Sequence, residues 1–366
     1  MAKKTTKKKT VAKKATTKKK TTQRSPKKKT SGGSSSAPTE TDFVGVLFIG
    51  DPHVEARTPI FRKDNFAETI LKKIQWCLEY ARDEKLQPVF LGDLFEKPRG
   101  NPNWIVHRLI EILSPHRPIG IYGNHDCADV GLTENDTLSI LIAAGCYRMV
   151  SQTSVYRAMM NDREVFIGGS SYREPIPEEF RLPPRKAQGL FDNDPLAIWI
   201  AHHDIGFPGY DNNRLDPHQI TNVELLINGH IHRRLESVQA GTTLWMTPGN
   251  IARRSRSEAA VQHAPSAMRV DVLPEDYQVS FVEIPHAPVE EVFQELLPGQ
   301  VETEQGESSF VTGLTELTSQ KTQGGLGLLR FLNDNVQQLE DPVAEVVLAL
   351  ADEVLDNTQS ELESHA

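Results

Sequence analysis

Residues 118–126 read Pro118-Ile119-Gly120-Ile121-Tyr122-Gly123-Asn124-His125-Asp126. An apolar run of strand length ends here in a glycine, and an amide, an imidazole and a carboxylate follow at once. Open α/β sheets bind their ligands at the carboxyl ends of their strands, so polar side chains directly after a buried strand are candidates for a site. We therefore expect a strand at 118–122 that presents Asn124, His125 and Asp126 at the edge of a sheet.

Four other apolar runs end in the same way. Asp51 and His53 follow the segment 43–49, and Asp93 follows 88–91. His202 and His203 follow 196–201, and His230 and His232 follow 223–227. Helical patterns lie at 64–84, 104–113 and 137–144, and further strand patterns at 164–168, 243–246 and 277–284. Strands that alternate with helices predict an α/β body, built as a two-sheet sandwich flanked by helices.

The composition is typical of a soluble globular protein. The chain has 366 residues, of which 38% are hydrophobic and 25% are charged. No run approaches the roughly 18 apolar residues of a membrane span. The three cysteines form no CxxC pair, which favours a reducing compartment and no disulfide framework. We expect a cytoplasmic or otherwise intracellular protein that associates with nucleic acid, is not secreted and does not enter a membrane.

The net charge of −8 hides a strong asymmetry along the chain. Residues 1–40 carry fourteen Lys and Arg against one acid, and residues 286–366 carry sixteen acids against two bases. With almost no apolar residues, the segment 1–40 is predicted to be a disordered basic arm that contacts nucleic-acid phosphates. Its repeated lysine clusters resemble linker-histone tails and include Lys7, Lys8, Lys9, Lys18, Lys19 and Lys20. A solubilising tail or a localisation signal is the alternative interpretation.

The expected domain organisation follows from these shifts in composition. The arm covers 1–40, the folded body 41–285, a short helix and polar linker 286–324, and an acidic helical hairpin 325–366. Valines and Leu350 form an apolar stripe on the second helix of that hairpin. Such a stripe usually packs on its own protein, and self-association or a partner contact is the alternative.

The polar residues at the strand ends are of the types that hold metal ions. Carboxylates, imidazoles and one amide without thiolates suit Mn, Fe or Zn in an open site and not a closed structural zinc site. Seven candidate ligands exceed the needs of one cation that keeps open positions. A shared carboxylate that bridges two metals would account for the number. The alternative is that these residues are scattered capping and core positions.

The motifs resemble those of the calcineurin-like metallophosphoesterase superfamily. DxH, GDx, GNH[DE], a lone His and GHxH stand here, in family order, as Asp51-Pro52-His53, Gly92-Asp93-Leu94, Gly123-Asn124-His125-Asp126, His202 and Gly229-His230-Ile231-His232. The resemblance implies a four-layer αββα sandwich. It also implies one metal held by Asp51, His53, Asp93 and His232 and another held by Asp93, Asn124, His202 and His230. His203, next to His202, remains an alternative ligand.

The resemblance also implies a mechanism of phosphoester hydrolysis. A hydroxide between two divalent cations would attack phosphorus in line, and His125 would protonate the leaving oxygen. Asp126 would orient His125 or act as an outer partner of the metal site. Several arginines near the last motif are candidates for phosphate contacts, although a solvated basic surface explains them equally well. They are Arg233, Arg234, Arg253, Arg254 and Arg256.

The flanking residues are closest to the SbcD-type DNA repair nuclease branch. Gly92-Asp93-Leu94-Phe95-Glu96 resembles that branch's GDLFD, and Pro248-Gly249-Asn250 resembles its PGS segment. Asn250 in place of serine, the acidic C-terminal region and the basic arm depart from the pattern. We expect a Mn-dependent DNA phosphodiesterase that binds DNA and has an SMC-like ATPase as a candidate partner. A phosphatase or phosphodiesterase for a small nucleotide or phosphoprotein, and a non-catalytic nucleic-acid scaffold, are the alternatives.

Overall fold

A computed structural model describes residues 43–59, 61–183, 193–210, 214–256 and 258–295. Contacts divide the chain into Met1–Ser36 and Ala37–Ala366, and every described residue belongs to the second unit. The basic arm, the acidic hairpin and most of the linker therefore lie outside the described residues. Within the described ranges, no helix is both long enough and apolar enough to cross a bilayer.

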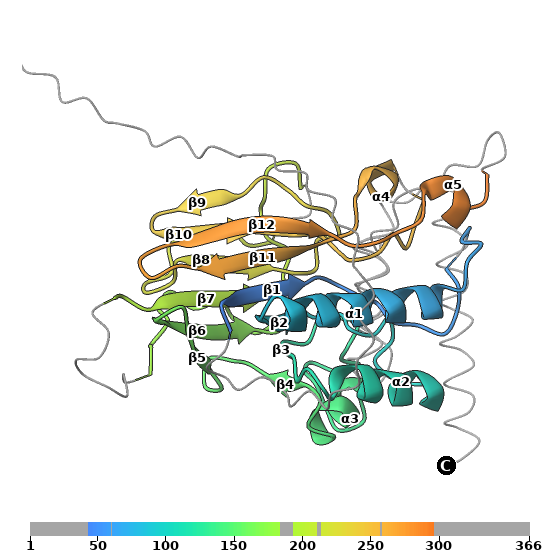
Figure 1. Ribbon diagram of the computed structural model, residues 1–366, viewed down its shortest axis with the longest axis horizontal. Helices are drawn as coiled ribbons and strands as arrows, with labels where there is room; N and C mark the ends of the chain where they lie inside the picture. The colour runs from blue at the N-terminus through green and yellow to red at the C-terminus, as the bar shows by residue number, and fades with distance from the viewer. Residues whose placement is uncertain (1–42, 60, 184–192, 211–213, 257, 296–366) are drawn as a thin grey trace, which may run out of the picture. The chain divides into compact units, whose positions relative to one another are not determined.

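The first of two six-stranded sheets has the order β12-β11-β1-β2-β3-β4 (Figure 1). Its four parallel strands run from β1 to β4, and β11 and β12 join antiparallel beside β1. The strands are β1 (Gly45–Ile49), β2 (Leu86–Phe90), β3 (Ile119–Gly120), β4 (Arg148–Met149), β11 (Ser266–Val272) and β12 (Tyr277–Glu283). The expected strand at 118–122 is thus a two-residue strand, although residues 118–121 are buried throughout.

The second sheet has the order β5-β6-β7-β8-β10-β9. Strands β6, β7, β8 and β10 are parallel, while β5 and β9 are antiparallel edges. The strands are β5 (Tyr156–Met160), β6 (Arg163–Ser170), β7 (Leu196–Ala201), β8 (Leu225–Asn228), β9 (Val238–Ala240) and β10 (Thr243–Met246). Both sheets are therefore mixed and centred on parallel strands, as the alternating pattern predicted.

The two sheets pack face to face over an apolar core. Strand β1 shows why, because its residues alternate between two environments. Val46 and Phe48 belong to the core shared with the second sheet, whereas Leu47 and Ile49 belong to the core beneath the helices. All four are completely buried. The predicted α/β sandwich is confirmed.

Helices cover the outer face of the first sheet. These are α1 (Phe66–Asp83), α2 (Asn103–Leu113) and α3 (Thr137–Ala143). Helix α1 lies along β1 and β2, and α2 packs beside α1 (Figure 1). Helix α1 begins at Asn65, whose side chain accepts a hydrogen bond from the Glu68 amide at 3.3 Å. Its apolar stripe, spaced by three and four residues, faces the sheet and includes Phe66, Ile70, Ile74, Cys77 and Leu78.

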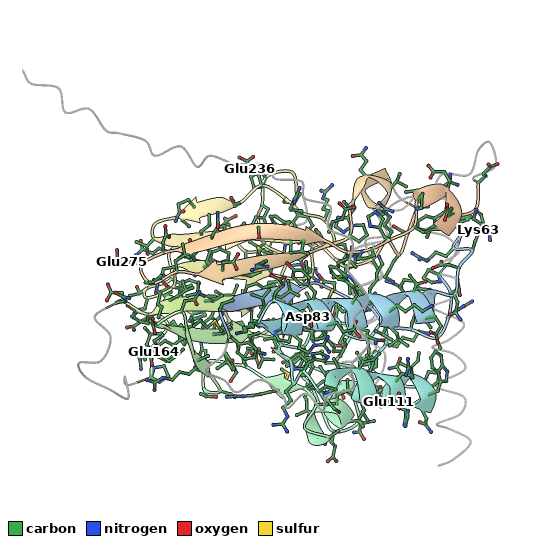
Figure 2. The ribbon with its side chains drawn as sticks, viewed as in Figure 1. Lys63, Asp83, Glu111, Glu164, Glu236 and Glu275 are labelled. Carbon is green, nitrogen blue, oxygen red and sulfur yellow. The ribbon has the colours of Figure 1, made fainter. Side chains whose placement is uncertain are left out.

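The outer face of the second sheet is covered differently. Phe166, Trp199 and Trp245 from its strands are buried there against Phe180 and Ile220 from connecting segments. In the part of the chain that the structure describes, this layer is made of loops and not of helix. Figure 2 shows Lys63, Glu111, Glu236 and Glu275 at the periphery of the ribbon.

The folded body continues past residue 285. Helix α5 (Val289–Val292) is a single turn, shorter than the helix expected there, and α4 (Glu258–Gln262) precedes β11. The Lys63 amide donates to the Val292 carbonyl at 2.8 Å, and the Gln294 amide donates to the Phe61 carbonyl at 2.7 Å. Phe293 is buried against the Arg62 guanidinium. Residues up to about 295 are therefore packed on the body.

Candidate metal centre

The five predicted strand ends meet at one edge of the sandwich. Parallel strands place their carboxyl ends at the same side of a sheet, and β1, β2, β3, β7 and β8 all do so here. Three groups of possible ligands result, each with its ligand atoms within 4.8 Å of one another. Two consist of residues at these strand ends, and the third is His53, Glu96 and His125. The first cluster is Asp51, His53, Asp93 and His232, and the second is Asp93, His202 and His230.

The first cluster converges on the ring of His53. Its Nε2 atom lies 2.9 Å from Nε2 of His232 and 3.6 Å from Oδ2 of Asp93. Asp51, His53 and Asp93 are buried, while His232 is exposed at the rim. The cluster is therefore open to solvent on one side.

The second cluster is completed by the amide of Asn124. Its Oδ1 atom lies 3.2 Å from Nε2 of His202 and 3.0 Å from Nδ1 of His230. The same His202 nitrogen is 3.1 Å from Oδ2 of Asp93. Asp93 thus contributes to both clusters, as expected of a carboxylate shared between two cations.

The backbone holds four of these residues in a rare conformation. The φ angles are 39° at Asp51, 48° at His53, 48° at Asp93 and 68° at His230, all in the left-handed region. Non-glycine residues there cost about 1–3 kcal/mol each and persist where the surroundings enforce them. Such strain concentrates at functional sites and supports a functional role for these loops.

Glycines in the motifs allow the loops to approach closely. A Cβ atom on Gly92, which has φ 96°, would lie 2.5 Å from Nδ1 of His202. A Cβ atom on Gly123 would lie 2.0 Å from Oδ1 of Asp93 and 2.6 Å from its amide nitrogen. Any side chain at these positions would displace a candidate ligand. The glycines of GD and GNHD are therefore steric requirements of the site.

The residues present fit a pair of divalent cations. Atom Oδ2 of Asp51 is buried without a hydrogen-bond partner, which is costly unless a cation contacts it. Burial raises the pKa of Asp51 to about 7. The remaining donors are imidazole nitrogens, a carboxylate and an amide oxygen, a set that suits divalent transition metals with open positions.

The shared carboxylate remains charged. Burial by itself would raise the pKa of Asp93, but the neighbouring His202 and His125 hold it well below the usual value. Burial would likewise lower the pKa of His202, and Asp93 outweighs this and raises it to about 9. In the metal-free site, a protonated His202 therefore stands beside the Asp93 carboxylate.

Outer partners orient three of the candidate ligand histidines. The Nδ1 atom of His53 donates to Glu96 at 2.8 Å, and Nδ1 of His202 donates to the Leu91 carbonyl at 2.7 Å. The Nε2 atom of His230 donates to Asp204 at 2.9 Å. Each acceptor fixes a proton on the outer nitrogen, so the other nitrogen can offer its lone pair to a cation. For His202 this requires loss of the second proton, which it carries in the metal-free site.

His125 lies next to the first cluster. Its Nδ1 atom donates to the Glu96 carbonyl at 2.9 Å and is 3.6 Å from the Glu96 carboxylate. Its ring stands edge-on to the ring of His53, with centroids 4.8 Å apart. A side chain that is 19% exposed can reach both the cluster and a molecule bound from solvent.

A family model described as calcineurin-like phosphoesterase matches residues 45–234, more than half of the chain. The chain belongs to the calcineurin-like phosphoesterase family. Members of this family bind two divalent metals, in agreement with two clusters that share Asp93. It is therefore a metal-dependent phosphoester hydrolase by family. A comparison with curated proteins finds no match.

Solved structures with similar chain traces are distant in sequence. A hypothetical protein from Thermus thermophilus is 12% identical with a TM-score of 0.36, and the match covers 66% of this chain and all of that one. A 5′-nucleotidase precursor from the same organism is 11% identical with a TM-score of 0.35, over 66% of this chain and 54% of that one. A predicted phosphoesterase from Streptococcus pneumoniae is 10% identical with a TM-score of 0.30, over 65% and 88%.

The structure places Asp126 beneath the motif loops of this phosphoesterase. Its carboxylate is completely buried and accepts hydrogen bonds from three backbone amides, those of Phe95 at 2.9 Å, Gly123 at 3.0 Å and Leu94 at 3.2 Å. These contacts join the loop after β2 to the loop after β3. They give Asp126 a place in holding the loops together. The expectation was that Asp126 orients His125 or is an outer partner of the metal site.

His203 points away from the cluster that contains His202. Its Nε2 atom donates to the Glu174 carbonyl at 2.8 Å, and its Nδ1 atom accepts from the His202 amide at 3.2 Å. Both ring nitrogens are thus engaged by the backbone. Of the two neighbouring histidines, the geometry brings His202 to the metal cluster.

The arginines proposed for phosphate contacts have different environments. Arg254 lies near the first cluster and pairs with Glu96 at 2.7 Å and Glu55 at 3.0 Å. Arg253 instead donates to the His263 carbonyl at 2.8 Å and contacts the His286 ring nitrogen Nε2 at 3.3 Å. The others are held by carbonyls or a ring: Arg233 by Gly209, Arg256 by Gln294 and Arg234 over Phe281. The lysines of the arm lie outside the described residues.

Two residues of the site were not singled out from the sequence. Glu96 contacts both His53 and His125, and Asp204 contacts His230. Both follow a motif residue closely, since Glu96 is three residues after Asp93 and Asp204 is two after His202. An acidic residue just beyond a ligand is the signal that could have found them.

Proposed function

We propose that this chain is a phosphodiesterase that acts on DNA with two divalent cations such as Mn²⁺. The observation that carries the proposal is the pair of clusters that share Asp93, with His125 beside them. When bound, two cations supply a nucleophile near neutral pH and neutralise charge on the phosphoryl oxygens.

In this proposal His125 passes a proton to the leaving oxygen. Its Nδ1 atom is committed to the Glu96 carbonyl, so Nε2 is the nitrogen that can carry the mobile proton. The Glu96 carboxylate stays charged: burial would raise its pKa, but the hydrogen bond from His53 and nearby positive charges hold it at about 2. A negative charge 3.6 Å from Nδ1 stabilises the protonated imidazole. Arg254 anchors this carboxylate.

The support for DNA as the substrate comes from the sequence. The segment 1–40 holds fourteen Lys and Arg, a charge density suited to contact with many backbone phosphates. The residues from Gly92 to Glu96 are similar to the corresponding segment of SbcD-type nucleases. An SMC-like ATPase, as in that branch, is the partner we propose for such a nuclease.

One set of assays tests the proposal. Purified protein is supplied with Mn²⁺ and incubated with linear DNA, bis-p-nitrophenyl phosphate and p-nitrophenyl phosphate. We expect DNA and the diester to be cleaved, and His125→Ala to abolish cleavage. The control is His107→Ala on α2, which removes an imidazole that is 72% exposed and should leave the rates unchanged.

The other outcomes point to different functions. Turnover of the monoester without DNA cleavage would refute the nuclease and indicate a phosphatase for a small nucleotide or a phosphoprotein. Retention of DNA binding without turnover of any of the three substrates would indicate a nucleic-acid scaffold.

A further inference from the structure

Helix α1 carries a lysine on the face that it buries. The side chain of Lys73 is only 7% exposed, and its amine donates a hydrogen bond to the Ile251 carbonyl at 2.9 Å. Burial, followed by the positive charges of Arg62 and Arg253, lowers the pKa of Lys73 to about 7. Lysines are rarely buried, because removing the ammonium group from water is costly. An apolar residue would fill this position at a lower cost, so the contact with Ile251 must have a role of its own.

The acceptor Ile251 belongs to an irregular segment, residues 249–254, that follows β10. Three carbonyls of this segment accept hydrogen bonds from three buried basic side chains. The pairs are Lys73 with Ile251, His263 with Asn250 and Arg62 with Arg253. Backbone carbonyls outside helices and strands need such partners when they are buried. Because the donors come from distant parts of the chain, tertiary contacts set the position of the segment.

The amides of two residues in this segment contact loops that carry the first cluster. The Ile251 amide donates to the Gly50 carbonyl at 3.1 Å, and Gly50 directly precedes the candidate ligand Asp51. The Asn250 amide donates to the carbonyl of His232, another candidate ligand, at 3.3 Å. The segment thus lies between the buried basic side chains and the backbone of two residues of the first cluster.

A side chain of the segment reaches a third residue of the first cluster. Arg254 pairs with Glu96 at 2.7 Å, and Glu96 accepts the Nδ1 proton of His53 at 2.8 Å. The loops are also closely packed, because a Cβ atom on Gly50 would lie 2.1 Å from the Gly249 carbonyl oxygen. A displacement of the segment would therefore be transmitted to the first cluster.

The second cluster has no such connection. Within the described ranges, the hydrogen bonds and ion pairs of the segment 249–254 do not reach Asn124, His202 or His230. The two clusters share Asp93 and differ in their other residues. We therefore expect a displaced segment to disturb the first cluster and to leave the second largely intact.

The side chains of the segment are not arranged for the greatest stability. Among the described residues, Oδ1 of Asn250 and Nε of Arg254 are buried without a hydrogen-bond partner. Such atoms lower the stability of a fold, and each of them calls for an explanation. External anchors that hold the segment against the metal centre would provide it.

We propose that Lys73 is a positioning residue for the first cluster and acts through the Ile251 carbonyl on the segment 249–254. Lys73 itself lies outside both clusters. Because metal ligands tolerate deviations of only about 0.2 Å, a small shift of the segment is enough to weaken a metal site. The inference rests on the two-metal function proposed above and adds to it a residue of helix α1.

Lys73→Met tests the inference by metal binding and not by turnover. Methionine keeps an unbranched side chain and removes the donor, so the Ile251 carbonyl loses its partner. Titration calorimetry on the metal-free protein counts the Mn²⁺ ions and measures the affinity for each. We expect one of two ions to bind about tenfold more weakly, at the lower end of the effect of losing an outer partner of a metal site. The affinity for the other ion should be unchanged.

Thermal unfolding of the metal-free protein separates positioning from a general structural role. Lys73→Met should unfold at the wild-type temperature or above, because the cost of burying an amine disappears with it. Lys73→Gln keeps an N–H donor on a shorter side chain and should retain more Mn²⁺ affinity than Lys73→Met. It also replaces Lys73→Met in the binding experiment if that variant does not fold. Lys72→Met is the matched control, since it removes the neighbouring exposed lysine and should change neither measurement.

Each result supports or overturns the inference. Selective weakening of one Mn²⁺ ion, with partial recovery in Lys73→Gln, supports it. Unchanged affinity for both ions overturns it, and so does an equal weakening of both ions together with a lower unfolding temperature, which indicates a structural role only. A wild-type protein that binds two Mn²⁺ ions but cleaves neither DNA nor bis-p-nitrophenyl phosphate overturns the proposed function and leaves the positioning role in place.

Discussion

Replacing Gly123 by alanine should disable both metal clusters through one steric conflict. The added Cβ atom would lie 2.0 Å from Oδ1 of Asp93, whereas ordinary contacts begin at 3.4 Å. The carboxylate would have to move by about 1.4 Å, the difference between these distances. It cannot rotate away freely, because the Cβ atom would also lie 2.6 Å from the Asp93 amide nitrogen. The backbone of the shared ligand must therefore shift.

The size of the effect follows from that displacement. Metal ligands tolerate deviations of about 0.2 Å, and a misplacement of about 1 Å in an active site costs about 100-fold in rate. We expect Gly123→Ala to lower kcat/KM on bis-p-nitrophenyl phosphate at least about 100-fold. We also expect the bound Mn²⁺ to fall from two per chain, measured by elemental analysis after dialysis. Overpacking should destabilise the fold by about 1–3 kcal/mol, measured by thermal unfolding.

Gly131→Ala is the matched control. The nearest atom to its added Cβ would be the Tyr122 hydroxyl at 3.4 Å, an ordinary contact. Activity and metal content should therefore stay close to those of the wild type. If Gly123→Ala kept two Mn²⁺ and wild-type activity, the close approach between this glycine and Asp93 would not exist in the protein, and our account of the site would be wrong.

Three further predictions concern the metals and the arm. Asp93→Asn should abolish binding of both Mn²⁺ ions while Asp51→Asn abolishes only one, because Asp93 belongs to both clusters; equal stoichiometry in the two variants would contradict a shared carboxylate. Mn²⁺ affinity should rise with pH between about 6 and 9 and then level off, because binding must displace protons from Asp51 and His202. Burial raises the pKa of Asp51 to about 7. Burial would lower the pKa of His202, but the Asp93 carboxylate outweighs it and raises that pKa to about 9. Titration calorimetry at several pH values measures this, and a pH-independent affinity would argue against it. Deleting residues 2–37 should weaken DNA binding and flatten its salt dependence while leaving cleavage of bis-p-nitrophenyl phosphate intact; unchanged binding would indicate a solubilising tail.

Much of the fold was predictable because its signals are local. The helix predicted at 64–84 is α1 at Phe66–Asp83, since a stripe of apolar residues at helical spacing needs only its own sequence to be recognised. The strand predicted at 196–201 is β7 with the same bounds, because a continuous apolar run is typical of a strand buried on both faces. Strand β3, in contrast, pairs over only two residues of the predicted five, because hydrogen bonding to β2 and β4 sets its length.

Strand β5 shows what local patterns leave out. Its sequence, Tyr156 to Met160, was not predicted as a strand, and it forms the antiparallel edge of the second sheet beside β6. Its side chains are alternately buried and half-buried, a pattern imposed by the neighbouring strand and the core beneath it. The pairing of β1 with β11, more than 200 residues later, could not be read from either segment alone.

The sequence by itself determined which side chains follow the strands, and that carboxylates, imidazoles and an amide gather at one edge of the sheets. This was possible because parallel strands must bring their carboxyl ends to one edge. Only the tertiary structure decided which of these residues contact one another. The contacts of His53 with His232 and of Asp51 with His230 each join residues 179 positions apart. The tertiary structure also placed Asp126 under the loops and joined Glu96 to His125, because these depend on distances that no local pattern encodes.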